Sequence, residues 1–254
     1  MKIMKPKVYN DFDPTGYWMS EKFDGVRAEW DGVGSFMSKA DKLYHVPYDM
    51  TVGMPNHPLS GEFYLGRGRF QETVSIVRNQ RMDLREWAPL KFLVFELPTV
   101  ENYTFEDRMF ILEGHKFSYP DFVHVVLWVK CQNPSHFESF YENIIERGGE
   151  GAVLAKANSL YEFKRSSNQW KRTPTFTAEA IVVDYTAGTG KHEGKVGALV
   201  VSDNRKSFKV GTGLSDVERE NPPPLGSSIT YSYKGLTNAG KPRHPAFLTV
   251  RDYE

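Results

Sequence analysis

Lys22 is the residue whose neighbours most clearly indicate chemistry. It lies in the stretch SEKFDGVRAEW, two residues before Asp24-Gly25 and five before Arg27. A lysine becomes a nucleophile when neighbouring cations and partial desolvation lower its pKa from the ordinary value of about 10.4. The same eleven residues also fit a β-hairpin, because Asp-Gly is a strong turn signal between strand-like runs. This stretch alone leaves both interpretations open.

Four further stretches carry residues suited to nucleotide chemistry. Glu62 lies in LSGEFYLG, Phe95 in LKFLVFELP and Glu150 in GGEGAVLAK, while Lys171 and Arg172 lie in RSSNQWKRT. Carboxylates hold hard cations such as Mg²⁺, an aromatic face stacks on a base, and basic side chains stabilise phosphate oxygens. Each residue taken singly has an ordinary structural explanation. Their combination and order favour a functional site.

The composition limits the classes of protein that this chain can represent. Its 254 residues suffice for two modest domains or one large one, and its 40% hydrophobic and 25% charged content is typical of soluble globular proteins. The single cysteine, Cys131, excludes an internal disulfide and a cysteine-rich zinc site. The seven histidines show no metal-binding spacing, so we expect no dedicated transition-metal site.

The charge and hydropathy patterns bear on partners and location. Lys+Arg and Asp+Glu both total 32, so a nucleic-acid-binding surface would have to concentrate its positive charge locally. No apolar run approaches the ~20 residues that span a bilayer, and we expect no membrane association. The start MKIMKPKVYNDFDP lacks the apolar core of a secretory leader. The expected location is therefore cytoplasmic, or periplasmic if a leader was removed before the numbering begins.

The predicted elements divide the chain into two parts. Short aromatic and branched runs predict strands in GYWMSEK, VRAEW, LSGEFYL, LKFLVFEL and FVHVVLWV. Capping boxes predict helices that begin at Thr104 and at Ser135, and FQETVSIVRNQ predicts a third. After about residue 175, five short strands follow at regular spacing: AEAIVVDY, GALVVSD, SFKVGTG, SITYSYKG and PAFLTVRD. This spacing is typical of an oligonucleotide-binding (OB) barrel.

The motifs together resemble those of a known superfamily. Their order resembles that of the covalent nucleotidyltransferases. It runs from Lys-x-Asp-Gly-x-Arg through Ser-Gly-Glu, an aromatic-acid strand and Glu-Gly to a basic strand before a small barrel. Within that superfamily, four longer stretches resemble the minimal ATP-dependent DNA ligases of bacteria and viruses, the ligase E type. They are GRGRFQETVSIVRNQ, NSLYEFKRSS, FKVGTGLSDVERENPPPLGSSITYSYKGLT and KPRHPAFLTVRD. The resemblance covers nearly the whole chain. It implies an α+β fold with a nucleotidyltransferase (adenylation) domain of antiparallel sheets and flanking helices at 1–174 and an OB-fold β-barrel at 175–254.

The resemblance also implies a reaction and its site. Lys22 would attack the α-phosphate of ATP and carry AMP, which would pass to the 5′-phosphate of a nick in duplex DNA before the 3′-hydroxyl attacks. The implied requirements are ATP and Mg²⁺, with Mn²⁺ as an alternative, and a monomer without an obligatory protein partner. The implied catalytic residues are Lys22, Asp24, Arg27, Glu150 and Lys171. The implied nucleotide contacts are Glu21, Lys22, Arg27, Glu62, Phe95, Lys171 and Arg251, with Glu62 and Glu150 also as metal ligands. The candidate DNA contacts are Lys39, Arg67, Arg69, Lys164, Arg165, Arg172, Lys191 and Lys195.

Four positions depart from the family pattern. Lys39 replaces an arginine, which keeps the charge but loses the bidentate fork. A basic residue usual near Ala155 and Lys156 has no certain counterpart, and Thr173 replaces the second lysine of the basic strand. Arg172 should point to the opposite face from Lys171, because side chains alternate along a strand. Thr249 takes a position that is often arginine.

Two rival interpretations remain open at this stage. An RNA ligase or a GTP-using RNA-capping enzyme shares the lysine chemistry, and ribose contacts that a sequence does not show would separate RNA from DNA substrates. A non-catalytic OB-fold nucleic-acid-binding protein is the second rival. The presence of Lys22, Asp24, Glu62 and Glu150 together speaks against it, because an inert protein needs none of them.

Overall fold

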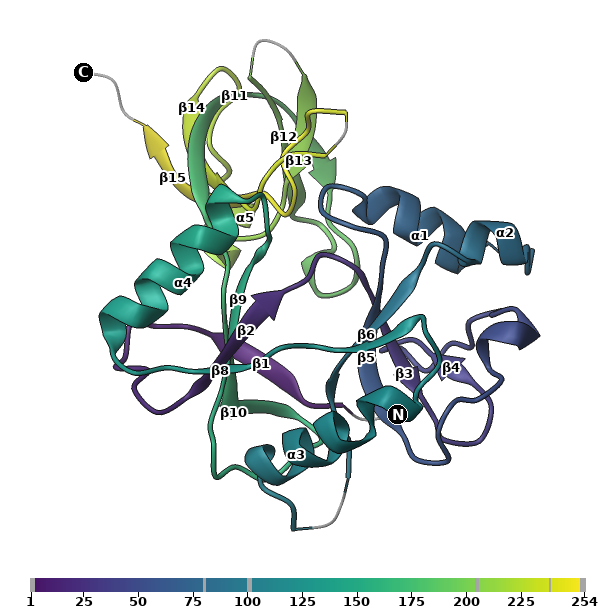
Figure 1. Ribbon diagram of the computed structural model, residues 1–254. Helices are drawn as coiled ribbons and strands as arrows, with labels where there is room; N and C mark the ends of the chain where they lie inside the picture. Colours follow the sequence, from purple (N-terminus) through teal and green to yellow (C-terminus); the bar gives the residue numbers. More distant parts are fainter. Residues whose placement is uncertain (1–2, 80, 100–101, 204–205, 238, 252–254) are drawn as a thin grey trace. The chain divides into compact units, whose positions relative to one another are not determined.

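The computed structural model describes residues 3–79, 81–99, 102–203, 206–237 and 239–251. The chain divides into two compact units, Met1–Arg172 (unit 1) and Thr173–Glu254 (unit 2) (Figure 1). Within the described residues, unit 1 holds two five-stranded sheets and unit 2 holds one. Among the described helices, none is both long and apolar enough to cross a membrane.

The first sheet of unit 1 contains the strand that ends at Lys22. Its strand order is β1-β10-β9-β2-β8, and only β1 and β10 pair in parallel. The strands are β1 (Lys5–Val8), β2 (Trp18–Lys22), β8 (Val129–Lys130), β9 (Gly151–Ala155) and β10 (Arg165–Arg172). The central position of β9 places it between β2 and β10, so residues of all three strands can share one face.

The second sheet of unit 1 has the order β4-β3-β5-β6-β7, with β6 and β7 parallel and the other neighbours antiparallel. Its strands are β3 (Val26–Trp30), β4 (Phe36–Met37), β5 (Leu59–Tyr64), β6 (Lys91–Glu96) and β7 (Val123–Val125). The Asp24-Gly25 segment therefore joins two different sheets, because β2 belongs to the first and β3 to the second. The hairpin interpretation of this segment is wrong.

In the part of unit 1 that the structure describes, four helices accompany these sheets: α1 (Phe70–Arg78), α2 (Leu84–Trp87), α3 (Phe105–His115) and α4 (Pro134–Glu146). α1 packs against β3 and β5, α3 against β6, and α4 against β2 and β9 (Figure 1). Short 3₁₀ turns lie at η1 (Tyr48–Met50) and η2 (Lys116–Ser118). α3 begins at the predicted capping box of Thr104 and Asp107. The predicted start of α4 at Ser135 is wrong, because Asn133 caps the helix and Pro134 takes its first position, where a missing N–H costs nothing.

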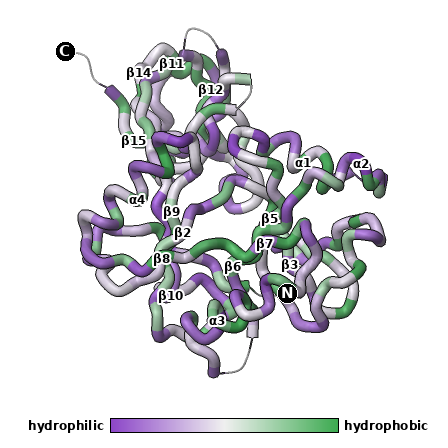
Figure 2. Tube along the Cα trace, in the orientation of Figure 1, coloured by the Kyte–Doolittle hydropathy of each residue, from purple (hydrophilic) through white to green (hydrophobic). Residues whose placement is uncertain are grey.

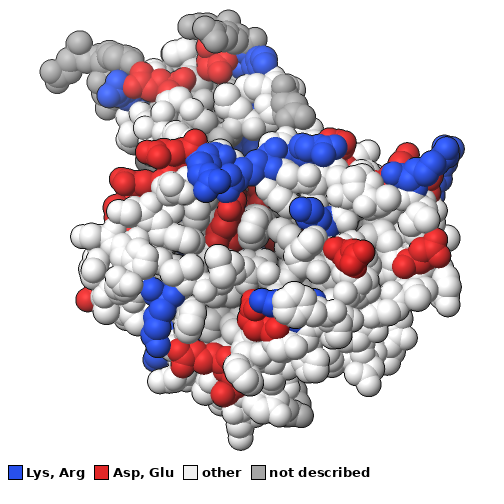
Figure 3. Space-filling model, viewed as in Figure 1, with Lys and Arg blue, Asp and Glu red and all other residues white. Residues whose placement is uncertain are grey.

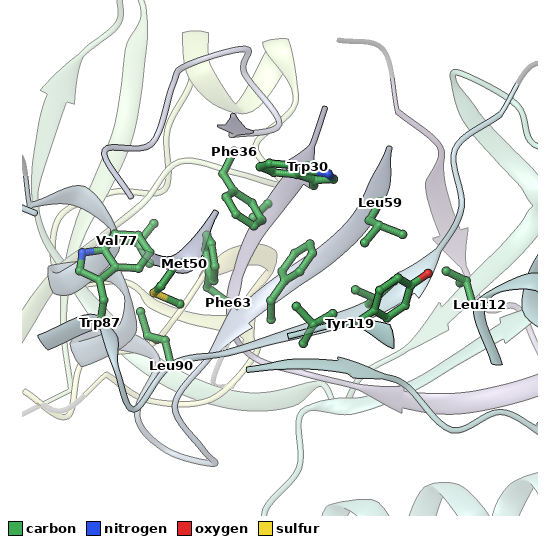
Figure 4. Close-up of a cluster of buried hydrophobic side chains, with 14 of the residues drawn as sticks. Trp30, Phe36, Met50, Leu59, Phe63, Val77, Trp87, Leu90, Leu112 and Tyr119 are labelled. Atoms are coloured by element: carbon green, nitrogen blue, oxygen red, sulfur yellow. The ribbon is translucent and has the colours of Figure 1, made fainter. Parts of the chain in front are cut away.

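The second sheet carries the largest hydrophobic core of unit 1. Trp30, Phe36, Phe63, Trp87 and Phe92 are buried there with aliphatic neighbours. Figure 4 labels the first four of these side chains. Their rings meet edge-on or tilted, as between Phe63 and Trp87 at a centroid distance of 5.3 Å. Burial of each such side chain contributes about 1.5–3 kcal/mol to folding. Figure 2 shows hydrophobic residues along the chain around β5 and β7.

The run FVHVVLWV, predicted as one strand, forms parts of two. Val123–Val125 is β7 of the second sheet, and Val129–Lys130 is β8 of the first. Between them, Val126 donates its backbone N–H to Val94 at 2.8 Å, and Leu127 accepts a hydrogen bond from the Ser20 hydroxyl at 2.8 Å. A continuous apolar run thus crosses from one sheet to the other, and periodicity alone does not reveal such a crossing.

Unit 2 contains the five predicted strands in the order β13-β12-β11-β14-β15, all antiparallel. They are β11 (Phe176–Ala187), β12 (Val196–Ser202), β13 (Ser207–Val210), β14 (Ser228–Tyr233) and β15 (Ala246–Arg251), with η3 (Gly190–His192) and the short helix α5 (Asp216–Glu220). The expected barrel is not closed by a ladder in the described part of the chain. Thr212, two residues after the end of β13, forms an isolated bridge with Ala246 of the other edge strand, β15.

Candidate active site

Lys22 and Glu150 form an ion pair at the end of the first sheet. In the antiparallel register of β2 and β9, Lys22 lies opposite Gly151, so Glu150 immediately precedes the paired position. The Lys22 Nζ atom lies 2.6 Å from Glu150 Oε2, and the two side chains are 24% and 26% exposed. Both groups are therefore partly desolvated and remain accessible to a ligand.

Gly25 brings the second sheet close to this pair. A Cβ atom at residue 25 would lie 2.7 Å from Cγ of Glu62 and would overlap the backbone of Phe63, so only glycine fits here. Arg27 lies opposite Glu62 in the register of β3 and β5, which puts the two side chains on one face. The glycine of the Asp-Gly pair thus allows the backbone after β2 to approach β5 of the second sheet closely.

The carboxyl of Glu62 has a strongly raised pKa. Desolvation raises the pKa of Glu62 to about 7, although Lys22 and Arg27 act to lower it, and the nearby Glu150 and Asp24 raise it further. Three carboxyls and two cations thus interact within a small region. A carboxyl that titrates near neutrality is characteristic of functional sites.

Phe95 is the extra residue of a β-bulge in β6. Ser60 pairs with Glu96 and Gly61 with Val94, so Phe95 has no partner residue on β5. Bulges re-aim side chains beside active sites. Phe95 is partly exposed, whereas its neighbours Val94 and Glu96 are buried. The guanidinium carbon of Arg27 lies 4.6 Å from the centre of the Phe95 ring, so these two predicted nucleotide contacts meet directly.

Arg27 is held in this position by a residue that the sequence interpretation missed. Its Nε donates to the carboxylate of Glu29, which is buried and also accepts a hydrogen bond from Ser60. Glu29 lies two residues after Arg27 on β3, hence on the same face. That spacing is the signal that could have identified it.

Lys171 lies on the same face of the first sheet as Lys22. It pairs with Val153 of β9, which in turn pairs with Ser20 of β2, two residues before Lys22. The registers of β9 with its two neighbours therefore put Lys22 and Lys171 on one face of the first sheet.

Arg172 points to the opposite face, as expected from strand alternation. Its guanidinium binds both carboxylate oxygens of Glu138 on α4, at 2.6 and 2.8 Å. It also lies 4.1 Å from the ring centre of Tyr141. The structure therefore does not bring Arg172 together with Lys22 and Lys171.

Glu21 and Arg67 form a bidentate ion pair behind the site. The Arg67 Nη2 and Nε atoms donate to Glu21 at 2.6 and 3.1 Å, and Nη1 donates to the backbone carbonyl of Arg147 at 3.1 Å. Arg69, two residues further on, pairs instead with Glu72, one turn along α1, at 2.8 Å. Of these two predicted DNA contacts, Arg67 lies closer to the Lys22 strand.

The remaining predicted DNA and nucleotide contacts lie on the surface. Lys39 is exposed in the turn after β4, Lys164 pairs with Glu162 at 2.8 Å, and Arg165 donates to the Pro6 carbonyl at 2.9 Å. In unit 2, Lys191 is exposed, Lys195 pairs with Glu220 at 2.7 Å, and Arg251 pairs with Glu179. Figure 3 shows that Lys and Arg gather locally on the visible face, although the net charge is zero.

A buried ion pair beneath Phe95 was also missed by sequence reasoning. Arg108 of α3 donates to both oxygens of Glu96, at 2.7 and 3.0 Å, and Gln169 of β10 donates to the same carboxylate at 3.1 Å. Arg108 further donates to the backbone carbonyls of Tyr103 and Ser159. This network joins the second sheet, α3 and β10 directly below the bulge.

The carboxylates of the site can be compared with the ligands that the expected Mg²⁺ requires. The described residues contain no group of three or more His, Cys, Asp or Glu side chains arranged to hold a metal. Mg²⁺ keeps several waters and needs only one or two protein carboxylates beside substrate phosphates. Glu62 and Glu150 interact electrostatically and both lie near Lys22. The pair fits a cation that is bound together with a phosphate-bearing substrate.

The sequence of the chain is similar to those of known proteins. The family model described as "ATP dependent DNA ligase domain" matches residues 59–173, and that described as "DNA ligase OB-like domain" matches residues 187–251. A DNA ligase of Haemophilus influenzae is 34% identical over 246 residues, which span 96% of this chain and 90% of that relative. DNA ligase 1 of Methanosarcina acetivorans is 28% identical over 58% of this chain and 29% of its own length.

The solved structures extend the comparison to the fold. A structure described as "DNA binding with a minimal scaffold: Structure-function analysis of Lig E DNA ligases" matches with a TM-score of 0.92 at 33% identity, covering 99% of both chains. The Chlorella virus DNA ligase-adenylate matches with a TM-score of 0.57 at 19% identity, which bears on the fold alone. The architecture is the nucleotidyltransferase-type ligase fold with an OB-like domain. The chain belongs to the family of ATP-dependent DNA ligases, and its fold matches a solved structure of the minimal Lig E type.

Proposed function

We propose that this enzyme seals nicks in duplex DNA with ATP, through AMP bound covalently to Lys22. The observation that carries the proposal is the partly exposed Lys22 amine, 2.6 Å from Glu150, beside the Arg27, Glu62 and Phe95 face of the second sheet. An amine, carboxylates, cations and an aromatic ring are the groups that adenylyl transfer from ATP requires. Family membership supports the same reaction.

The first step is nucleophilic attack by Lys22. The amine must lose its proton, and the Glu150 carboxylate at 2.6 Å is within reach to accept it. The nitrogen then forms a bond to the α-phosphorus of ATP while the bond to the pyrophosphate oxygen breaks. Pyrophosphate leaves, and AMP remains on Lys22. Asp24, next to the Gly25 approach, contributes to the field of carboxylates around the reacting atoms.

The nucleotide is proposed to bind across the two sheets of unit 1. Phe95 stacks on adenine, Glu62 binds the ribose, and Arg27 and Lys171 stabilise charge on the phosphate oxygens. Arg251 is a further nucleotide contact that the family resemblance implies, whereas the carboxylate of Glu21 is bound by Arg67. Glu62 and Glu150 would hold Mg²⁺, with Mn²⁺ as an alternative; the ion would neutralise charge on the phosphates and the leaving group. Each role uses a residue type suited to it.

The later steps use nicked DNA as substrate. AMP passes from Lys22 to the 5′-phosphate of the nick, and the 3′-hydroxyl then attacks that phosphate and releases AMP. Phosphate contacts would hold both ends in place. The proposed contacts are Lys39, Arg69, Lys164, Arg165, Lys191 and Lys195, all of which carry positive charge on exposed or partly exposed side chains.

We further propose that residues 1–174 act as the adenylation domain and 175–254 as the OB-fold domain. All the proposed catalytic side chains belong to unit 1 of a single chain, which supports action as a monomer. The family model that matches residues 187–251 supports the assignment of the second domain.

Covalent labelling tests the proposal directly. Incubation with α-labelled ATP and Mg²⁺, without DNA, should label a 29.1 kDa band that survives denaturation. Lys22→Ala should remove the label, whereas the control Lys116→Ala, at an exposed lysine of unit 1, should keep it. An unlabelled wild-type protein contradicts the proposal. Sealing assays that compare nicked DNA with nicked RNA, and ATP with GTP, then test the RNA-directed alternatives.

A further inference from the structure

Arg67 joins three segments that surround the Lys22–Glu150 pair. It lies in the loop between β5 and α1, binds Glu21 of β2 through two nitrogens, and binds the carbonyl of Arg147 at the C-terminal end of α4 through the third. Glu21 immediately precedes Lys22, and Arg147 lies three residues before Glu150. The guanidinium of Arg67 thus connects the two segments that carry Lys22 and Glu150 to the loop that follows β5 of the second sheet.

The packing around Arg67 restricts movement of these segments. A Cβ atom at Gly149 would lie 2.9 Å from Glu21 Oε1, so the turn before Glu150 passes close to the carboxylate that Arg67 binds. The ring of Phe23 meets that of Tyr64 edge-on at 5.3 Å, which fixes the same loop from the other side of Lys22. The hydrogen bonds that Arg67 donates to Glu21 raise the pKa of Arg67, as expected for a well-formed pair. Arg67 is 33% exposed and Glu21 17%.

We propose that Arg67 and Glu21 are positioning residues for adenylation, which hold Lys22 and Glu150 at reacting distance, and that Arg67 does not act primarily as a DNA contact. The inference rests on the proposed lysyl-AMP chemistry. Glu21 extends from β2 on the face opposite to Lys22, because neighbouring side chains alternate along a strand. The pair therefore acts on the backbone of Lys22 and Glu150, and neither member needs to touch ATP.

A positioning role predicts a specific kinetic pattern. Small misplacement of reacting groups costs about 10²-fold in rate, so Arg67→Ala and Glu21→Gln should each slow the maximal rate of lysyl-AMP formation, without DNA, about 10- to 100-fold. The ATP concentration for half-maximal rate should stay unchanged. The double variant Arg67→Ala/Glu21→Gln should form lysyl-AMP no more slowly than the slower of the two single variants, because the two residues act as a unit. Arg67→Lys, which keeps the charge and loses the fork, should be intermediate.

The measurement is single-turnover labelling with α-labelled ATP over a range of ATP concentrations, at a temperature where circular dichroism shows each variant folded. Arg85→Ala is the matched control, because Arg85 forms an exposed arginine–carboxylate pair with Asp83 away from the site. Glu21→Gln keeps the size of the side chain and provides the test if Arg67→Ala does not fold. The control should label at the wild-type rate.

The outcomes separate this inference from the proposed function. A wild-type protein that takes no label contradicts the proposed function. A labelled wild type with Arg67→Ala and Glu21→Gln at the wild-type rate overturns only the inference. If those variants label normally but bind nicked DNA more weakly, with a smaller salt dependence, Arg67 is a DNA contact.

Discussion

The carboxylate of Glu150 lies 2.6 Å from the amine of Lys22, although 128 residues separate them in the sequence. The antiparallel register of β2 and β9 produces this contact, because it sets Lys22 opposite Gly151. A one-residue shift of the register would turn the side chains of β2 to the other face. The contact therefore depends on the pairing of two strands within one sheet.

Glu150→Gln should slow lysyl-AMP formation about 10²- to 10⁴-fold, the usual contribution of a positioned proton acceptor. The amide keeps the size of the side chain but cannot take the proton from Lys22. Rapid-quench labelling with ATP gives the rate. Glu113→Gln is the matched control, because Glu113 forms an exposed pair with Lys116 at the same 2.6 Å distance. A wild-type rate in Glu150→Gln would show that the proton goes elsewhere.

Glu62 should make stability depend on pH near neutrality. Desolvation raises the pKa of Glu62 to about 7 in the folded protein, from an ordinary value of 4.5. The folded state therefore binds this proton more tightly than the unfolded state does. The contribution of the protonated Glu62 to the free energy of unfolding is fully present below pH 4.5 and is lost as the pH rises through 7. In urea titrations from pH 5 to 8, the wild type should lose stability relative to Glu62→Gln. Parallel pH profiles for the two proteins would contradict the raised pKa.

Phe95→Ala should weaken ATP binding more than it slows the chemical step. Stacking of a base on an aromatic ring contributes about 1–3 kcal/mol, so the ATP concentration for half-maximal labelling should rise about 5- to 150-fold. Phe110→Ala is the control, because Phe110 is a phenylalanine of unit 1 that is 81% exposed on α3. An unchanged ATP requirement in Phe95→Ala would show that the ring serves packing alone.

The local elements were predictable because their signals are local. The aromatic and branched runs of β2, β3, β5 and β6, the capping box at Thr104 and the five strands of unit 2 follow from neighbouring residues. The order of motifs predicts that Lys22, Glu62, Phe95 and Glu150 belong to one site. The structure brings Arg27 into contact with Phe95 and Lys22 into contact with Glu150.

The features that could not be predicted depend on pairing between distant segments. Asp24-Gly25 reads as a hairpin turn, but its two strands enter different sheets. FVHVVLWV crosses between the sheets, and its apolar character is the same on both sides of the crossing. The partners of Arg67 and Arg108 lie 46 and 12 residues away, and no local pattern specifies them.

The Glu96–Arg108 pair should be a major determinant of the stability of unit 1. Arg108→Met leaves Glu96 buried without its partner, which costs about 3–5 kcal/mol. Burial already raises the pKa of Glu96 in the intact pair. Loss of Arg108 should raise it further, so the variant should be less destabilised at pH 5 than at pH 8. Denaturant unfolding at both pH values measures this difference, and Glu96→Met/Arg108→Met should regain part of the loss.

Nick sealing should fall steeply with salt if local positive charge binds the DNA backbone. Each phosphate contact contributes a slope of about −0.9 in log K against log salt concentration. Lys39 is exposed in the turn after β4, so Lys39→Ala should weaken binding of nicked duplex and reduce the slope by about one. Lys116→Ala should leave both unchanged. An unaltered slope in Lys39→Ala would exclude a phosphate contact there.

Arg172 provides the contrasting case, because its guanidinium is bound to Glu138 and packed on Tyr141. The hydrogen bonds that Arg172 donates to Glu138 raise the pKa of Arg172 and lower the pKa of Glu138. To reach a phosphate, Arg172 would have to give up both contacts. Arg172→Gln should therefore lower the denaturant midpoint and leave the salt slope of DNA binding at the wild-type value. A reduced slope without loss of stability would restore Arg172 to the DNA-binding surface.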